Sequence, residues 1–253
     1  MSLIEDNNVE PATPSKVPQI GSILVDKHGL STEQSSAPYV PPGNDSELDR
    51  ELVTLFNPNS KKTRNIRALR TRVMLRADHL AIAVTGAVSG EGCSYVAANL
   101  AVSFAQMGKK TILVDANHHD PRQHEIFALG RTPGLTELVS PRANSGPHSF
   151  HIPGVPALSV MPAGAPSPNA DEIMCGTRGA RLIELLKSQY EVVIIDTPNG
   201  ATSSMPEWYA NKVGQALLVV RKNKSRWSNS QRLSKRLAEH AEVIGVAMTD
   251  HKR

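Results

Sequence analysis

Short apolar runs alternate with longer amphipathic stretches along most of the chain after residue 60. The runs predicted as strands are Leu80–Thr85, Thr111–Asp115, Leu158–Met161, Val192–Asp196, Ala216–Val220 and Val243–Met248. The stretches predicted as helices between them are Ser94–Met107, Asp120–Leu129, Ala170–Ser188 and Ser228–His240. Nearly continuous apolar strands that alternate with helices are typical of a parallel sheet covered on both faces. The pattern predicts a doubly wound, mostly parallel α/β domain over about 61–253.

The first part of the chain has a different pattern. Residues 1–60 are rich in Pro, Ser, Asn and acidic side chains, which predicts a largely disordered, flexible arm. Within it, Ile20, Ile23 and Leu24 have helical spacing. Ser31 with Gln34 could open another helix. A loose amphipathic segment is the preferred interpretation of this stretch, and a docking element is the alternative.

A basic helix is predicted between the arm and the first strand, over Lys61–Arg76. Ile66, Leu69 and Val73 form one apolar stripe on it, and arginines surround the stripe. This helix and the basic run Arg221–Arg226 could attract DNA or anionic lipid. A solvated or subunit-facing surface is the preferred interpretation of both.

Composition narrows the functional classes. Aromatic residues make up 4% of the chain, too few for the stacking surface that single-stranded nucleic acid requires. The net charge of +4 is modest, and two cysteines suggest no disulfide framework and a reducing compartment. Neither a signal peptide nor an apolar run of about 20 residues is found, so we expect a cytoplasmic protein.

The most informative motif is a glycine-rich turn that follows the first predicted strand and precedes a helix. This is the context of a phosphate-binding loop, in which glycines let backbone N–H groups surround a phosphate at a helix N-terminus. The candidate nucleotide-binding residues are Gly90, Glu91, Gly92, Cys93, Ser94 and Tyr95. The sequence therefore predicts a nucleotide site.

The lysine that normally follows the last loop glycine is replaced by Cys93, whereas Ser94, whose hydroxyl usually binds Mg²⁺, is present. Losing a comparable electrostatic donor lowers a rate roughly 10²–10³-fold, so binding could survive while turnover falls. A thiol at a helix N-terminus can be reactive, but a substitution without redox function is strongly preferred for Cys93. His118, His119 and His124 are interpreted as surface-loop residues rather than metal ligands.

Two predicted strands end in an acidic residue, Asp115 in one and Asp196 in the other. Ligands of open α/β sheets bind at the carboxyl ends of the strands, so both are candidate catalytic residues. Asp196, together with Ser94, is the candidate Mg²⁺ ligand, and Asp115 could bind metal or activate an attacking hydroxyl. Helix capping or loop solvation is the alternative interpretation of both carboxylates and is ranked second.

Together these motifs resemble the bacterial tyrosine kinases. The matching segments are Val88–Ser94, Leu113–Asn117, Ile194–Pro198 and Arg67–Thr71. Pro121–His124, Met161–Gly164 and Leu218–Asn223 are similar to one branch, the chain-length-determinant tyrosine kinases of exopolysaccharide systems. The resemblance covers about residues 61–250.

The resemblance implies a P-loop NTPase domain of the MinD/ParA-like class that binds ATP or ADP with Mg²⁺. In an active form, Ser94 and Asp196 would hold Mg²⁺ and Asp115 would orient the acceptor hydroxyl. It also implies a membrane-bound polysaccharide chain-length regulator as partner, which would recruit the protein to the inner membrane, and a possible homo-oligomer. Nucleic acid is not an expected partner.

Several departures from the family pattern favour reduced or lost catalysis. Asn117 replaces the second aspartate of an acidic motif, Arg64 stands in place of a glutamate of the oligomerising helix, and a tyrosine-rich C-terminal tail is not found. An active ATP-dependent tyrosine kinase, in which another basic group replaces the lysine, remains an alternative. A partitioning ATPase is a second alternative, although such proteins usually carry a lysine at the position of Val88.

Overall fold

The computed structural model describes residues 22–26, 29–33, 48–76, 80–131, 133–140 and 148–250. Within these residues, seven strands form one sheet in the order β5-β6-β4-β7-β3-β8-β9. The strands are β3 (Leu80–Gly86), β4 (Thr111–Asp115), β5 (Phe150–Ile152), β6 (Val155–Met161), β7 (Val192–Asp196), β8 (Gln215–Arg221) and β9 (Glu242–Thr249). Only the pairing of β5 with β6 is antiparallel in this sheet, so the predicted mostly parallel α/β fold is confirmed.

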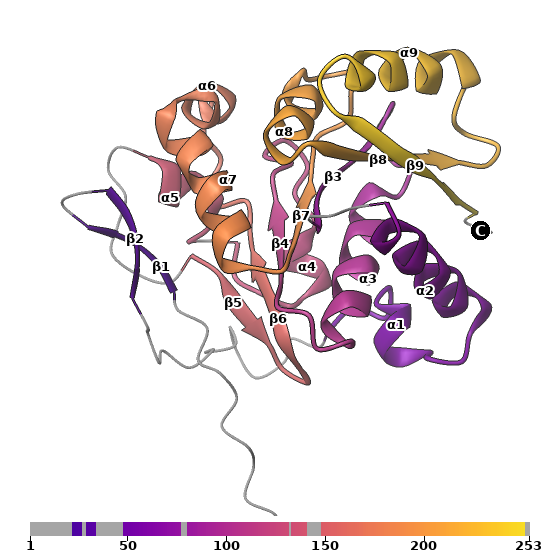
Figure 1. The fold of residues 1–253 in the computed structure, drawn as a ribbon, viewed down its shortest axis with the longest axis horizontal. Coiled ribbons are helices and arrows are strands. Elements are labelled where there is room, and N and C mark those ends of the chain that lie inside the picture. Colours follow the sequence, from indigo (N-terminus) through magenta and orange to yellow (C-terminus); the bar gives the residue numbers. More distant parts are fainter. Residues whose placement is uncertain are drawn as a thin grey trace, which may run out of the picture.

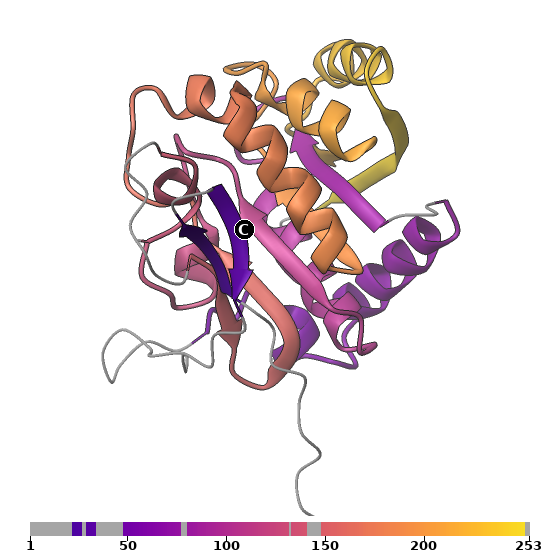
Figure 2. The same ribbon diagram turned by 60° about the vertical axis from the view of Figure 1, so that its left-hand side comes forward.

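Helices cover both faces of the sheet (Figure 1). They are α1 (Val53–Phe56), α2 (Lys61–Met74), α3 (Cys93–Ala105), α4 (Gln123–Ile126), α5 (Leu135–Val139), α6 (Ala170–Cys175), α7 (Thr177–Gln189), α8 (Met205–Val213) and α9 (Trp227–Ala238). One core lies between the sheet and α3 and is extended by α2 and α4. The other lies beneath α5 to α9, and Figure 2 shows α7, in orange, running alongside the strands that it covers.

Two predicted helices differ from the observed ones. The helix predicted over Asp120–Leu129 is reduced to the single turn of α4. The chain before it forms a turn in which the Arg122 N–H donates to the Asp115 carboxylate, so the helix begins only at Gln123. The helix predicted over Ala170–Ser188 is divided at Gly176, whose extended backbone ends α6 and begins α7. The sequence pattern did not predict α1, α5, α8 or β5.

The arm contains strands where a helix was predicted. β1 (Ser22–Asp26) and β2 (Gly29–Glu33) pair as an antiparallel hairpin separate from the large sheet. The helical interpretation of Ile23 and Leu24 and of Ser31 is therefore wrong, since all three lie in paired strands. The Ile-Leu-Val run of β1 favours a strand as much as a helix, and pairing with β2 decides between them. Ile20 and Gln34 lie outside the described residues.

Residues 48–60, assigned to the arm from their composition, pack against the domain. Leu52 and Thr54 are fully buried, and Val53 is nearly so. The Thr54 hydroxyl and amide both donate to the Asn99 side chain on α3, at 3.1 and 3.2 Å. Asn99 is itself buried, so this contact is part of the interior and the packed part of the chain begins before Lys61. No helix among the described residues has the length and apolar character needed to cross a membrane.

Candidate nucleotide site

The glycine-rich turn joins β3 to the N-terminus of α3, as the sequence predicts. Gly90 and Gly92 have φ values of 77° and 93°, in the left-handed region that glycine adopts without strain. A Cβ atom on Gly86, where β3 ends, would clash with the Glu91 carboxylate and lie 2.9 Å from the Cys93 sulfur. Glycine is therefore required for the loop to fold back this tightly and present its N–H groups at the start of α3.

Glu91, predicted as a nucleotide-binding residue, anchors the loop through contacts within the protein. Its side chain is 1% exposed, and one carboxylate oxygen accepts the Val88 N–H at 3.0 Å. The other oxygen accepts the hydroxyl of Ser225, and the Glu91 carbonyl accepts the Thr249 hydroxyl at 2.6 Å. Ser225 follows β8 and Thr249 ends β9, so two neighbouring strand ends hold the loop in place.

Asp115 and Asp196 lie next to each other at the carboxyl ends of the paired strands β4 and β7. The two residues are 0% and 1% exposed. The Asp115 carboxylate accepts three backbone N–H groups, from Asn117 at 3.2 Å, Arg122 at 3.0 Å and Gln123 at 2.9 Å. Asp115 thus closes the turn before α4, which is the capping role that the sequence analysis ranked second.

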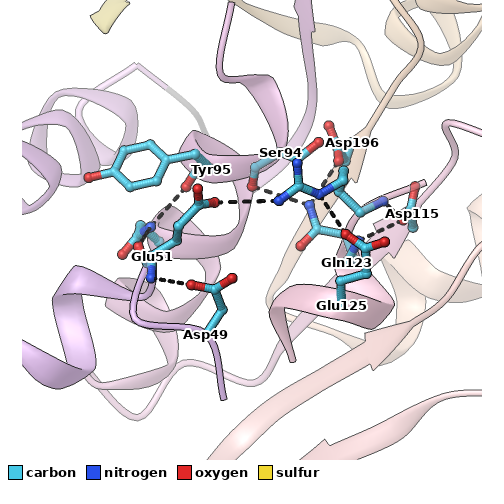
Figure 3. Close-up of polar contacts among 10 residues, drawn as sticks. Asp49, Glu51, Ser94, Tyr95, Asp115, Gln123, Glu125 and Asp196 are labelled. Carbon is cyan, nitrogen blue, oxygen red and sulfur yellow. Dashed lines mark hydrogen bonds and ion pairs between the residues drawn. The ribbon is translucent and has the colours of Figure 1, made fainter. Parts of the chain in front are cut away.

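Asp196 has a different set of contacts (Figure 3). Its Oδ2 atom accepts the side-chain amide of Gln123 at 2.8 Å, and the same amide reaches the Ser94 carbonyl at 3.2 Å. Its Oδ1 atom is buried and has no hydrogen-bond partner among the described residues. One oxygen of Asp196 is therefore held by the protein, and the other remains an unused acceptor beside the loop.

Burial raises the pKa of three groups at the site, Asp196, Asp115 and Cys93. It raises the pKa of Asp196 to about 6, although the side chains of Gln123 and Ser94 partly oppose this. Burial and the nearby Asp196 raise the pKa of Asp115 well above its usual value. Burial, with Asp196 and Glu91, also raises the pKa of the Cys93 thiol well above its usual value. A reactive cysteine needs a lowered pKa, so the direction of this shift does not favour redox sensing at Cys93.

The residues present fit a Mg²⁺ ion held together with a phosphate. Mg²⁺ is usually bound through one or two carboxylates plus substrate phosphates, and Asp196 offers a buried, unused oxygen near Ser94. Asn117 does not add a ligand, because its side chain bonds the backbone of Asp120 through both its oxygen and its nitrogen. Among the described residues, no group of three or more His, Cys, Asp or Glu side chains forms a separate metal site.

Most of the predicted site residues come together at this edge of the sheet. Tyr95 does not, because its ring points away from Ser94 and Asp196 (Figure 3) and packs against the core beneath α3. The sequence analysis placed Gln123 in a segment that resembles the family, Pro121–His124, but gave it no role at the site. It also missed the contacts of the β8–α9 turn with the loop. That turn was noticed as a basic run and as part of a segment that resembles the family, not as a neighbour of the loop.

The fold and the loop define the P-loop class of nucleotide-binding proteins. The septum site-determining protein MinD of Pyrococcus horikoshii, solved in complex with Mg-ADP, has the same fold with a TM-score of 0.55. The two chains are 20% identical over 66% of this chain and 68% of that one, which is a likeness of fold alone. No family model matches the chain.

The sequence relatives are named as tyrosine-protein kinases of bacteria. The chain is 28% identical over 211 residues to the tyrosine-protein kinase YwqD of Bacillus subtilis, covering 82% of this chain and 89% of YwqD. It is 31% identical over 189 residues to the putative tyrosine-protein kinase EpsB of Ralstonia solanacearum, covering 74% of this chain but only 25% of EpsB. The chimerical protein CapA2B2 superposes with a TM-score of 0.73 and 27% identity over 84% of this chain and 95% of that one. The chain is therefore a homologue of bacterial tyrosine-protein kinases, as its motifs indicate.

Proposed function

We propose that the protein binds ADP or ATP with reduced or lost tyrosine kinase activity and acts in exopolysaccharide biosynthesis. The proposal rests on one contrast: the loop backbone has the conformation of a phosphate site, whereas the side chains expected to serve catalysis are replaced or bound elsewhere. The loop keeps the glycine conformations of a phosphate site, whereas its lysine position holds Cys93. Asn117 and Asp115, at positions that serve catalysis in the family, are bound to local backbone groups.

The chain's own residues would act as follows. Backbone N–H groups of the loop would bind the phosphates, aided by the positive end of α3. Ser94 and the free oxygen of Asp196 would hold Mg²⁺, which when bound neutralises charge on the phosphates. Asp115 would orient an acceptor hydroxyl. Its carboxylate already accepts three backbone N–H groups, however, which weakens it for this role.

The proposed partner is the cytoplasmic end of a membrane-bound polysaccharide chain-length regulator, which would recruit this protein from the cytoplasm to the inner membrane. The resemblance of several motifs to the chain-length-determinant branch supports this proposal. Self-association is also proposed, by analogy with the family. Nucleic acid is not proposed as a partner, because the net charge of +4 is small and aromatics are few.

Calorimetry with ADP and ATP, with and without Mg²⁺, tests the nucleotide proposal. We expect binding weaker than that of a relative with the loop lysine, and no phosphotyrosine after incubation with Mg-ATP. A relative such as YwqD is the positive control for both measurements. Robust phosphotyrosine on the purified protein would favour the alternative of an active kinase.

Co-purification from membranes tests the partner. We expect recovery of a chain-length regulator and no tight DNA binding at physiological salt. Nonspecific DNA affinity rests on phosphate contacts and falls roughly 10³–10⁵-fold between 50 and 200 mM salt for a protein that makes several of them. Tight DNA binding at physiological salt without a membrane partner would favour the partitioning-type alternative.

A further inference from the structure

The turn between β8 and α9 lies against the phosphate-binding loop. β8 pairs in parallel with β3, and Gly86 is opposite Val219, so the turn after β8 emerges beside the loop after β3. The Arg221 guanidinium donates to the Gly90 carbonyl at 3.1 Å. Ser225, at the other end of the turn, donates to Glu91. The two ends of the turn are thus fixed to the loop.

The turn is also closed internally, which fixes the residues between its ends. The Arg221 carbonyl accepts the N–H groups of Lys224 at 3.1 Å and Ser225 at 2.9 Å, and the Arg221 N–H donates to the Ser225 hydroxyl at 2.7 Å. Asn223 has a φ of 61°, the left-handed conformation that asparagine tolerates in tight turns. The direction of Lys224 is therefore set by a rigid backbone.

Lys224 extends over the loop. A Cβ atom on Gly90 would clash with its Nζ atom, so the ammonium group lies directly on the loop backbone. Its side chain is exposed and forms no ion pair with a described residue. By contrast, the Lys222 side chain on the same turn pairs with Asp250 at 3.5 Å. Lys224 is the cation that the turn presents to the loop without an anionic partner.

We propose that Lys224 replaces the missing loop lysine and binds phosphate oxygens of the nucleotide from the β8–α9 turn. This inference rests on the proposed nucleotide binding. In the usual loop the positive charge comes from a lysine at the position of Cys93. Here it would come from the β8–α9 turn, at the exposed side of the loop beside Gly90. A lysine ammonium acts as a point charge with rotatable donors, so it can serve a phosphate from either direction.

Calorimetry of Lys224→Met with ADP, ATP and adenosine tests this proposal, with Lys222→Met as the matched control. Both variants keep a long stem and lose one exposed charge of the same turn. We expect Lys224→Met to weaken ADP and ATP about tenfold, near the lower end for hydrogen bonds to charged groups, because the rim is exposed. Adenosine binding should not change, and Lys224→Arg should retain most of the affinity for both nucleotides.

A double-variant cycle sharpens the result. In a Cys93→Lys background the loop has its own cation, so Lys224→Met should weaken ADP by clearly less than in the native background. Equal losses for Lys224→Met and Lys222→Met, or equal losses for ADP and adenosine, would overturn the role of Lys224 alone. Failure of the native protein to bind ADP, with its fold verified by circular dichroism, would overturn the proposed function and this inference with it.

Discussion

The phosphate-binding loop and the acidic pair, Asp115 and Asp196, lie at the same edge of the sheet but differ in the contacts that hold them in place. The loop is fixed from outside by side chains of the β8 and β9 ends, and an ammonium group without an ion-pair partner among the described residues lies on it. The acidic pair is buried, and Asp115 and Asp196 are bound by backbone and side-chain amides of the α4 turn. Nucleotide binding would depend on the first region and phosphoryl transfer on the second, so the difference supports the proposed nucleotide binding with reduced turnover.

Distorting the loop should have the largest effect. Gly92→Val would place a branched side chain at a φ of 93° with its Cβ 3.2 Å from the Thr249 methyl group. We expect ADP affinity to fall more than about 100-fold, because several charge-assisted bonds to phosphate depend on this backbone. Calorimetry measures the loss.

Gly108→Val is the matched control for that variant. Gly108 has a φ of 79°, and its Cβ would meet nothing within 4 Å, so the substitution introduces similar backbone strain at the turn after α3. Equal losses of ADP affinity in both variants would mean that strain alone, and not the shape of the loop, is responsible.

Restoring the loop lysine should have the next largest effect. Cys93→Lys adds a cation without changing the glycine backbone, and we expect ADP to bind about tenfold more tightly. Cys93→Met, which lengthens the side chain without charge, should give no gain. Unchanged affinity in Cys93→Lys would indicate that another cation, of which Lys224 is the candidate, already saturates the phosphates.

The sequence predicted the elements of the site better than the contacts between them. β4 and β7 were predicted with their observed bounds, because each is a continuous apolar run that ends in Asp. The loop glycines likewise indicate a tight turn. The contacts of the acidic pair depend on the register of β4 against β7 and on the path of the α4 turn, neither of which the pattern contains. The role of Lys224 depends likewise on β8 being the neighbour of β3.

Removing the charge of Asp196 should stabilise the protein at neutral pH. The pKa of Asp196 is raised from 3.8 to about 6 in the fold, so the folded state binds more protons than the unfolded chain within this window. Stability contributed by this group therefore falls as pH rises from about 4 to about 6. We expect Asp196→Asn to raise the melting temperature by about 3 °C at pH 7 and by little at pH 4.

Thermal unfolding at both pH values, followed by circular dichroism, checks this expectation. Glu172→Gln, at an exposed position of α6, is the control and should change neither melting temperature. A lower melting temperature of Asp196→Asn at pH 7 would mean that contacts stabilise the charged carboxylate. Burying this charge would then not reduce the stability of the fold.

The smallest expected effect concerns Gln123, whose amide holds the Oδ2 atom of Asp196. Gln123→Ala would free this oxygen for Mg²⁺ or its bound water, so we expect the gain in ADP affinity on adding Mg²⁺ to increase about threefold. Gln106→Ala is the control, because it removes a comparable amide that bonds the Thr54 carbonyl at 3.1 Å, at the other end of α3. Calorimetric titrations with and without Mg²⁺ measure the difference. A smaller Mg²⁺ effect in Gln123→Ala would show that the amide orients Asp196 for the metal, and the acidic region would then resemble the loop in being prepared for its ligand.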